Sequence, residues 1–306
     1  MISRDIKKKI LLDYKSRNDA YALFQTLTPI CLIFLLYLFA SNYSFDKTFA
    51  LVIPIGWVYY RLFFPLHDLC HENLFNSKIL NIFFGYFIAS IFATPFRSFQ
   101  SEHIDHHKFA GSNNDPARSD YNFKIESKKK LVIFLIGPLF GNNILEKIKA
   151  LYKDLPFFNN KLQKTEKINF DVIGIVFIIL MQIIIFSIVT KLNFSYAWKY
   201  LYFVILPGIT ISLFLSRLRQ FLEHFADEVT NSDNKKYTAR TFSCSFLTSI
   251  LFTSNSFQYH DEHHEFPSIS SFHLPEIHNL YKYNDNQKKN YKKSYAKVFK
   301  SIWNSI

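Results

Sequence analysis

Residues 48–71 read TFALVIPIGWVYYRLFFPLHDLCH, a long apolar run that ends in two closely spaced histidines. The apolar part, 48–66, contains one charged residue, Arg61, near its end. A helix needs about 20 predominantly apolar residues to cross the hydrocarbon core of a bilayer. The stretch therefore predicts a membrane-spanning helix that continues past the membrane surface and carries His67 and His71 there.

Histidines recur in two further groups of five residues. The first pentad, 67–71, has the pattern HxxxH, whereas 103–107 and 260–264 both read HxxHH. Residues three and four apart share one face of a helix, so each pentad points two or three imidazoles in one direction. The three pentads together hold His67, His71, His103, His106, His107, His260, His263 and His264.

The repetition of this pattern is too specific to be accidental. The chain has 11 His among 306 residues. At that frequency one HxxHH is expected about 0.014 times, and two have a probability on the order of 1 in 10,000. Neutral imidazole is a ligand for iron, zinc, copper and nickel. Eight imidazoles exceed the four ligands that a zinc ion takes, so the pentads predict a site for two metal ions.

The distribution of charge predicts how the chain crosses the membrane. Segments 1–20, 103–167 and 217–306 hold six, twelve and twelve Lys and Arg residues. Because cytoplasmic segments of membrane proteins are enriched in these residues, we expect all three segments, and both termini, in the cytoplasm. Four spanning helices satisfy this arrangement, at roughly 21–42, 48–66, 170–190 and 198–217.

Three other apolar runs, 79–96, 131–145 and 241–259, are expected to be re-entrant or to lie in the membrane interface. If 79–96 crossed the membrane once, His67 and His103 would face opposite compartments, and the run is too short to cross twice. The same reasoning applies to 241–259, which precedes His260. The predicted fold is therefore an all-α integral membrane protein with four transmembrane helices and a cytoplasmic, histidine-rich di-metal cap.

Composition narrows the class of protein further. Only 7 Gly occur, and neither GxGxxG nor GxxxxGK is present, which argues against nucleotide-binding folds. Three Cys exclude a disulfide scaffold and a four-cysteine zinc site. The formal net charge of +12 is explained by the cytoplasmic segments, so we expect no nucleic-acid partner. We expect one domain over 1–306, with a basic N-terminal segment 1–20 and a soluble C-terminal tail 279–306.

Four stretches of the chain resemble the membrane fatty acid desaturase family. They are HDLCHENLF at 67–75, SEHIDHHKFAGSNNDP at 101–116, RQFLEH at 219–224 and QYHDEHHEFPSISSFHLPEIH at 258–278. The last stretch is similar to the acyl-lipid members of the family. The second, with its Asn-Asp-Pro, also resembles carotenoid ketolases and hydroxylases of the same superfamily.

The resemblance implies a non-haem di-iron centre with about nine histidine ligands. Eight are the pentad histidines, and the ninth is His224, in Leu-x-x-x-Glu-His. His273 and His278 are interpreted as packing or surface residues. Asp68, Asp105 and Asp261 stand beside ligands, where carboxylates can orient an imidazole through its second nitrogen. Gln220 and Glu223, near His224, are weaker candidates for such support.

The activity that the resemblance implies is desaturation of a fatty acyl chain with O2 as co-substrate. The sequence contains no motif for a nucleotide, haem or ferredoxin-type cluster, so a separate electron donor of the ferredoxin or cytochrome b5 type is expected. Such donors are acidic, and the run Lys128, Lys129 and Lys130 is a candidate docking patch. The other partners expected are membrane lipids and the lipid or acyl substrate itself.

Two alternative functions remain open from the sequence. One is a hydroxylase or ketolase of the same superfamily that acts on a carotenoid or another lipid with the same ligands. The other is a metal transporter or sensor without enzymatic activity, whose histidines would line a path through the membrane. All 11 His, however, fall in segments that the charge distribution assigns to one side.

Overall fold

The computed structural model describes residues 4–121, 125–142, 171–225, 239–284 and 293–306. Predicted features within 122–124, 143–170, 226–238 and 285–292 lie outside the described residues; they include much of the middle basic segment and part of the C-terminal tail. The described part is helical and contains no β-strand, only two isolated bridges, Thr241 with Tyr259 and Phe242 with Lys293. This agrees with the predicted all-α class.

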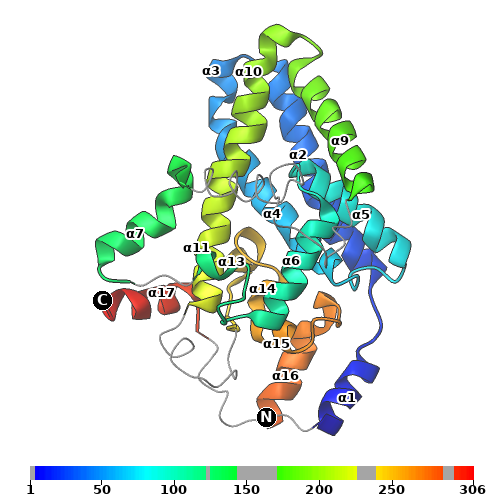
Figure 1. Ribbon diagram of the computed structural model, residues 1–306, viewed down its shortest axis with the longest axis vertical. Helices are drawn as coiled ribbons and strands as arrows, with labels where there is room; N and C mark the ends of the chain where they lie inside the picture. The colour runs from blue at the N-terminus through cyan, green and yellow to red at the C-terminus, as the bar shows by residue number, and fades with distance from the viewer. Residues whose placement is uncertain (1–3, 122–124, 143–170, 226–238, 285–292) are drawn as a thin grey trace, which may run out of the picture.

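Four helical segments are long and apolar enough to cross a membrane, as predicted. The first is α2 (Asp19–Asn42), and the third is α9 (Val172–Thr190). The second, Phe45–Cys70, consists of α3 (Phe45–Thr48), η1 (Phe49–Leu51) and α4 (Val52–Cys70). The fourth, Phe194–His224, consists of η4 (Phe194–Tyr196), α10 (Ala197–Tyr200), η5 (Leu201–Ile205), η6 (Gly208–Ser212) and α11 (Leu213–His224). Figure 1 shows these helices side by side in the upper part of the molecule.

Two of these helices extend beyond their apolar runs, and the extensions carry histidines. The second segment continues past residue 66 to Cys70, as predicted, so His67 lies on the same helix as the apolar run. The fourth continues to His224 instead of residue 217. Apolarity marks only the part of a helix that lies in lipid, whereas hydrogen bonding continues into the polar turns beyond it.

The fourth segment is irregular where it passes α4. Both η5 and η6 are π-helical, and Pro207, which lacks a backbone N–H, lies between them. Gly56 of α4 faces this region: a Cβ at Gly56 would lie 2.6 Å from Cβ of Ile211. The missing side chain therefore allows the two helices to approach closely, as small residues do in membrane bundles.

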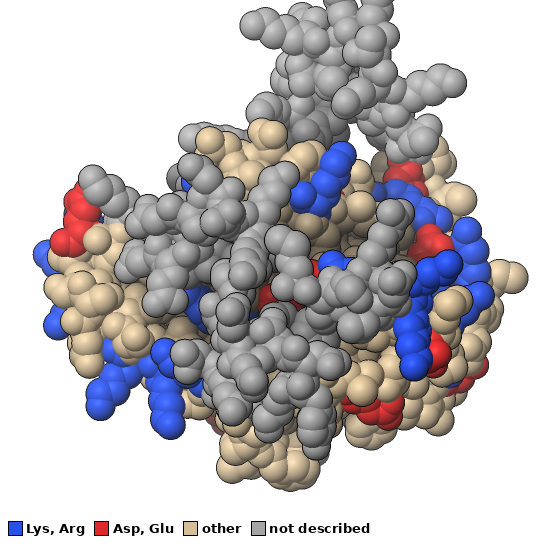
Figure 2. Space-filling view, turned by 90° about the horizontal axis from the view of Figure 1, so that it is seen from below, with Lys and Arg blue, Asp and Glu red and all other residues tan. Residues whose placement is uncertain are grey.

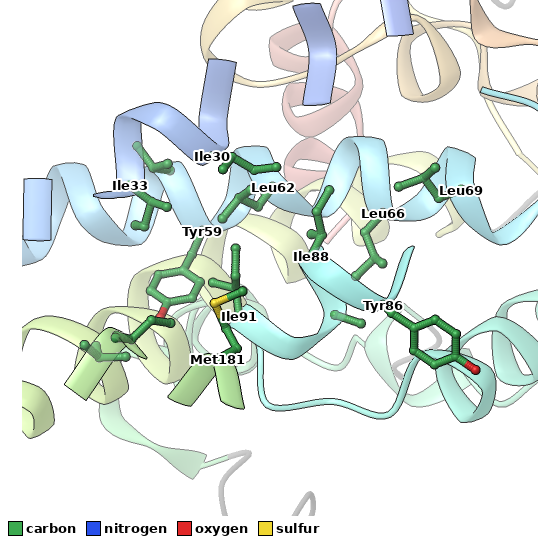
Figure 3. Close-up of a cluster of buried hydrophobic side chains, with 14 of the residues drawn as sticks. Ile30, Ile33, Tyr59, Leu62, Leu66, Leu69, Tyr86, Ile88, Ile91 and Met181 are labelled. Atoms are coloured by element: carbon green, nitrogen blue, oxygen red, sulfur yellow. The ribbon is translucent and has the colours of Figure 1, made fainter. Parts of the chain in front are cut away.

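The main core lies among α2, α4, α5 (Lys78–Ile91) and α9. Figure 3 shows its side chains converging from these four helices: Ile30 and Ile33, then Tyr59, Leu62, Leu66 and Leu69, then Tyr86, Ile88 and Ile91, and Met181. On the outside of α9, large apolar side chains such as Ile173, Leu180 and Ile183 are exposed. An apolar outer surface of this kind suits a helix that faces lipid.

The run predicted at 79–96 forms a bent helix pair. It comprises α5 and the start of α6 (Phe96–Phe109), and the two axes differ by 102°. Ala93 has φ 52°, a conformation that non-glycine residues adopt mainly in sharp turns. Gln182, in the middle of α9, donates to the Ser90 carbonyl at 2.6 Å, while Asp171, at the start of α9, accepts from the backbone N–H of Arg97 at 3.1 Å. The chain therefore turns back along α9.

Most of the remaining helices lie near or below the lower ends of α4 and α11, whereas α7 and η3 lie to one side of the fourth segment (Figure 1). They are α1 (Arg4–Asp13), η2 (Arg118–Asp120), α7 (Lys128–Ile136), η3 (Gly137–Phe140), α13 (Phe246–Leu251), α14 (Asn255–Gln258), α15 (His260–Glu265), η7 (Ser271–His273), α16 (Leu274–Asn284) and α17 (Tyr295–Asn304). Leu131 of α7, Phe221 of α11 and Val298 of α17 share a second core, which fixes the end of α11.

Candidate metal centre

The nine histidines named from the sequence come from four helices. His67 lies in the last turn of α4 and His71 at its C-cap. Another three, His103, His106 and His107, occupy one side of α6, and His224 is the last residue of α11. The short helix α15 carries His260, His263 and His264. Each helix ends or begins at the same level of the molecule, so the imidazoles meet there.

Five of these histidines form one group, called cluster A: His67, His71, His103, His107 and His263. Their potential ligand atoms all lie within 4.8 Å of one another. Nε2 of His103 is 2.9 Å from Nε2 of His71 and 3.2 Å from Nε2 of His107. Such convergence of nitrogen atoms suits a single metal ion.

The other four form cluster B: His106, His224, His260 and His264, again with ligand atoms within 4.8 Å of one another. Nε2 of His260 is 3.0 Å from Nε2 of His224. The two clusters are neighbours, because the rings of His107 in cluster A and His264 in cluster B stack with centroids 4.2 Å apart. The arrangement offers two adjacent metal positions with five and four nitrogen ligands.

Several of these imidazoles fit a metal ion better than any protein partner. Buried nitrogens of His67, His107, His263 and His264 have no hydrogen-bond partner among the described residues. Buried polar atoms without partners are costly, so a ligand is expected there. Burial also lowers the pKa of His263 and His264 well below the ordinary value, which keeps them neutral. Neutral imidazole is the form that binds metals.

A carboxylate holds one histidine in each cluster. In cluster A, Asp68 Oδ1 lies 3.0 Å from Nδ1 of His67 and also accepts a hydrogen bond of 2.5 Å from the Ser256 hydroxyl. In cluster B, Asp115 Oδ1 lies 2.9 Å from Nδ1 of His106. Such bonds orient the ring and leave Nε2 for a metal.

Comparisons with known proteins agree with this geometry. A family described as fatty acid desaturase matches residues 47–294. The chain is 21% identical over 287 residues to a fatty acid desaturase of Bacillus subtilis (strain 168), which covers 86% of this chain and 76% of that protein. It is 25% identical over 229 residues to a sphingolipid delta(4)-desaturase of Candida albicans, with 71% and 57% coverage. A delta(9) fatty acid conjugase-like enzyme of Dimorphotheca sinuata is 23% identical, with 88% and 79% coverage.

The chain belongs to the fatty acid desaturase family. This desaturase is therefore an oxidoreductase of lipid metabolism, as the resemblance to the family implied. Its four long apolar helices indicate a membrane protein, and its buried histidines are compatible with a metal centre.

The supporting residues of the desaturase differ in part from those named in the sequence. Asp68 lies on His67, but Asp105 is exposed on α6 and no described contact joins it to an imidazole. Gln220 is half-buried, and the described contacts likewise include none between it and a histidine. Asp261 is half-buried on α15. Glu223, in contrast, is fully buried, with one oxygen 3.7 Å from Nε2 of His260.

Sequence reasoning missed Asp115, which lies nine positions beyond His106. Burial alone raises the pKa of Asp115, but hydrogen bonds from His106, Tyr121 and the backbone of Ala117 outweigh burial and hold the pKa below its ordinary value. The residue was visible as the middle of Asn-Asp-Pro in the second quoted stretch. Its distance along the chain gave no sign of a contact with His106.

His273 and His278 lie outside both clusters. Nε2 of His273 lies 3.1 Å from the Ser16 hydroxyl. His278 contacts Glu262 through Nδ1 at 2.6 Å, and Glu262 also accepts from the hydroxyl of Thr241. Because Glu262 stands between His260 and His263 on α15, this contact ties α16 to the helix that carries three histidines of the centre.

Proposed function

We propose that this desaturase uses O2 to introduce a double bond into a fatty acyl chain of a membrane lipid or related lipid, at a di-iron centre, with electrons from a separate carrier. The observation that carries the proposal is the division of nine histidines into two adjacent groups of five and four. Family membership and relatives named as desaturases support the reaction class.

In this proposal cluster A and cluster B each hold one iron ion. When bound, the two ions supply the oxidation of an unactivated C–H bond by O2, which no side chain can perform as a base. The protein contributes orientation and a dry environment. Asp68 and Asp115 hold the proton on Nδ1 of His67 and His106. Phe257, whose ring lies 4.5 Å from that of His67, packs with Phe63 and Phe64 and excludes water on the side of the spanning helices.

We propose that the bent pair of α5 and α6 is re-entrant. The 14 residues of α5 span about 21 Å, less than the hydrocarbon core. The contacts of Ser90 with Gln182 and of Arg97 with Asp171 support entry beside α9 and return to the same side. This arrangement keeps His67 and His103 in one compartment, which we assign to the cytoplasm together with both termini.

The run 241–259 follows the same principle beside α4. Trp57 and Arg61 donate to the backbone carbonyls of Leu251 and Thr253, both at 2.7 Å, near the end of α13. Ser256 then contacts Asp68, which lies about 16 Å from Trp57 along α4. We propose that this segment enters the membrane along α4 and returns, which brings His260 to the level of His67.

For the electron donor, we propose an acidic carrier of the ferredoxin or cytochrome b5 type that docks on Lys128, Lys129 and Lys130. All three lysines are exposed at the start of α7. Leu131 and Leu135 of α7 share a core with Phe221 of α11, the helix that ends at His224 in cluster B. Figure 2 shows basic side chains at both sides of the face seen from below, with acidic side chains among them. The exposed lysine run is the part that would attract an acidic partner.

The test is the lipid profile of a host that expresses the wild type, His106→Ala or His273→Ala together with a competent donor. We expect a new unsaturated acyl chain with the wild type, measured by gas chromatography and mass spectrometry, and its loss with His106→Ala. His273→Ala is the matched control, because His273 lies outside both clusters, and it should retain the product. If the acyl profile is unchanged and oxygen is found inserted into a carotenoid or another lipid, the reaction is hydroxylation or ketolation and not desaturation.

A further inference from the structure

Asp115 is a buried carboxylate next to cluster B that contacts three residues at once. It lies in the turn after α6 and is 5% exposed. Its two oxygens lie 2.9 and 3.1 Å from Nδ1 of His106. The backbone N–H of Ala117 donates to Oδ1 at 2.8 Å, and the Tyr121 hydroxyl donates to Oδ2. The carboxylate thus accepts hydrogen bonds from an imidazole, a backbone N–H and a hydroxyl.

Tyr121 links this carboxylate to the rest of cluster B. The residue is buried, and its hydroxyl accepts from the backbone N–H of Gly111 at 2.9 Å, which places it between the two ends of the turn. Its ring lies 5.0 Å from the ring of His224. Removal of the hydroxyl alone would therefore leave the ring packing but take away one of the three partners that hold Asp115.

The corresponding support in cluster A is made by different residues. His67 is held by Asp68, and Asp68 is held by the hydroxyl of Ser256 from α14. In both clusters a buried carboxylate lies between a histidine and a hydroxyl. Among the described residues, the two sets have no residue in common. Each metal position consequently has its own orienting pair.

Resting on the proposed di-metal function, we infer that Asp115 and Tyr121 are positioning residues for the metal ion of cluster B, and that Asp68 and Ser256 serve cluster A in the same way. Removal of one carboxylate should then release one metal ion and leave the other. Loss of a hydrogen bond that orients a metal-binding histidine typically weakens metal binding by about 10- to 100-fold.

The experiment counts metal ions on the full-length protein in detergent, by reconstitution with Fe²⁺ without oxygen and, as a redox-inert probe, with Co²⁺. We expect two ions per chain for the wild type and about one for Asp115→Asn or Asp68→Asn at ion concentrations that saturate the wild type. Tyr121→Phe should bind its second ion roughly 10-fold more weakly. Asp115→Glu, which keeps a carboxylate, should restore part of the affinity.

Double variants show which ion is lost. Asp115→Asn combined with His264→Ala, two changes that both affect cluster B, should still bind one ion. Asp115→Asn combined with His263→Ala, which removes a histidine of cluster A, should bind none. The inference would be overturned if Asp115→Asn and Tyr121→Phe both bind two ions with the affinity of the wild type. A wild type that binds fewer than two ions would instead overturn the proposed di-metal function. Tyr121→Phe, which keeps the buried ring, carries the test if Asp115→Asn does not fold.

Discussion

Glu262 is a buried carboxylate on α15, between two histidines of the centre. Burial alone raises its pKa, but the hydrogen bond and charge of His278, together with Thr241, hold the pKa below its ordinary value. Removal of His278 would leave a buried acceptor without its strongest partner. We therefore expect His278→Ala to lower the free energy of unfolding by about 1–3 kcal/mol, measured by thermal or denaturant unfolding in detergent.

The matched control is His278→Gln, whose amide can still donate to Glu262. It should recover part of the stability lost in His278→Ala. If both variants unfold at the wild-type midpoint, the contact between His278 and Glu262 does not stabilise α15.

Spacing along the chain identified the histidines of the two clusters better than it identified the carboxylates that contact them. The structure brings together all nine named histidines, and their binding of metal stays a prediction. Asp105 was chosen because it stands between His103 and His106, but on a helix it is rotated by about 200° from His103 and faces away. Asp115 approaches His106 only because the turn after α6 folds back, and a single sequence carries no direct sign of such a turn.

The contact between α4 and the fourth apolar segment depends on the absence of a side chain at Gly56. A Cβ there would lie 2.6 Å from Cβ of Ile211 and 3.1 Å from the carbonyl oxygen of Pro207. We expect Gly56→Ala to separate the helices and to lower the free energy of unfolding by about 1–3 kcal/mol, seen as a lower thermal midpoint in detergent.

Gly208→Ala is the control for this prediction. A Cβ at Gly208 meets nothing nearer than the ring of Tyr59, at 3.9 Å, so little change in the midpoint is expected. Wild-type stability of Gly56→Ala would show that the helices can shift apart without loss. Apolar runs predicted the helices themselves, but they could not reveal the π-helical segments around Pro207, which depend on packing against α4.

At the scale of the whole molecule, the proposed topology places all the histidines on one side of the membrane. We expect cysteines introduced by Glu102→Cys and Ser268→Cys, at exposed positions near cluster A, to react with an impermeant thiol reagent from the same side. A cysteine introduced by Lys47→Cys, in α3 at the start of the second span, should react from the opposite side. The measurement uses sealed vesicles of each orientation.

The background for this labelling is a chain whose three native cysteines, Cys31, Cys70 and Cys244, are replaced. Labelling of positions 102 and 268 from opposite sides would contradict a shared di-metal centre and the re-entrant interpretation of α5 and α6. The four long helices could be predicted because apolarity over membrane length is a strong signal. The turn at Ala93 and the contacts of Thr253 involve side chains from distant helices, which the sequence does not pair.

The adjacent residues His106 and His107 serve different clusters, and so do His263 and His264. Neighbours on a helix are separated by a rise of about 1.5 Å and a turn of about 100°, both set by covalent geometry. The backbones of α6 and α15 therefore set the spacing between the two proposed metal positions, because each helix contributes adjacent histidines to both clusters. With a metal ion in each cluster, we expect the separation of the two ions to stay the same when the spanning helices tilt in a thicker or thinner bilayer.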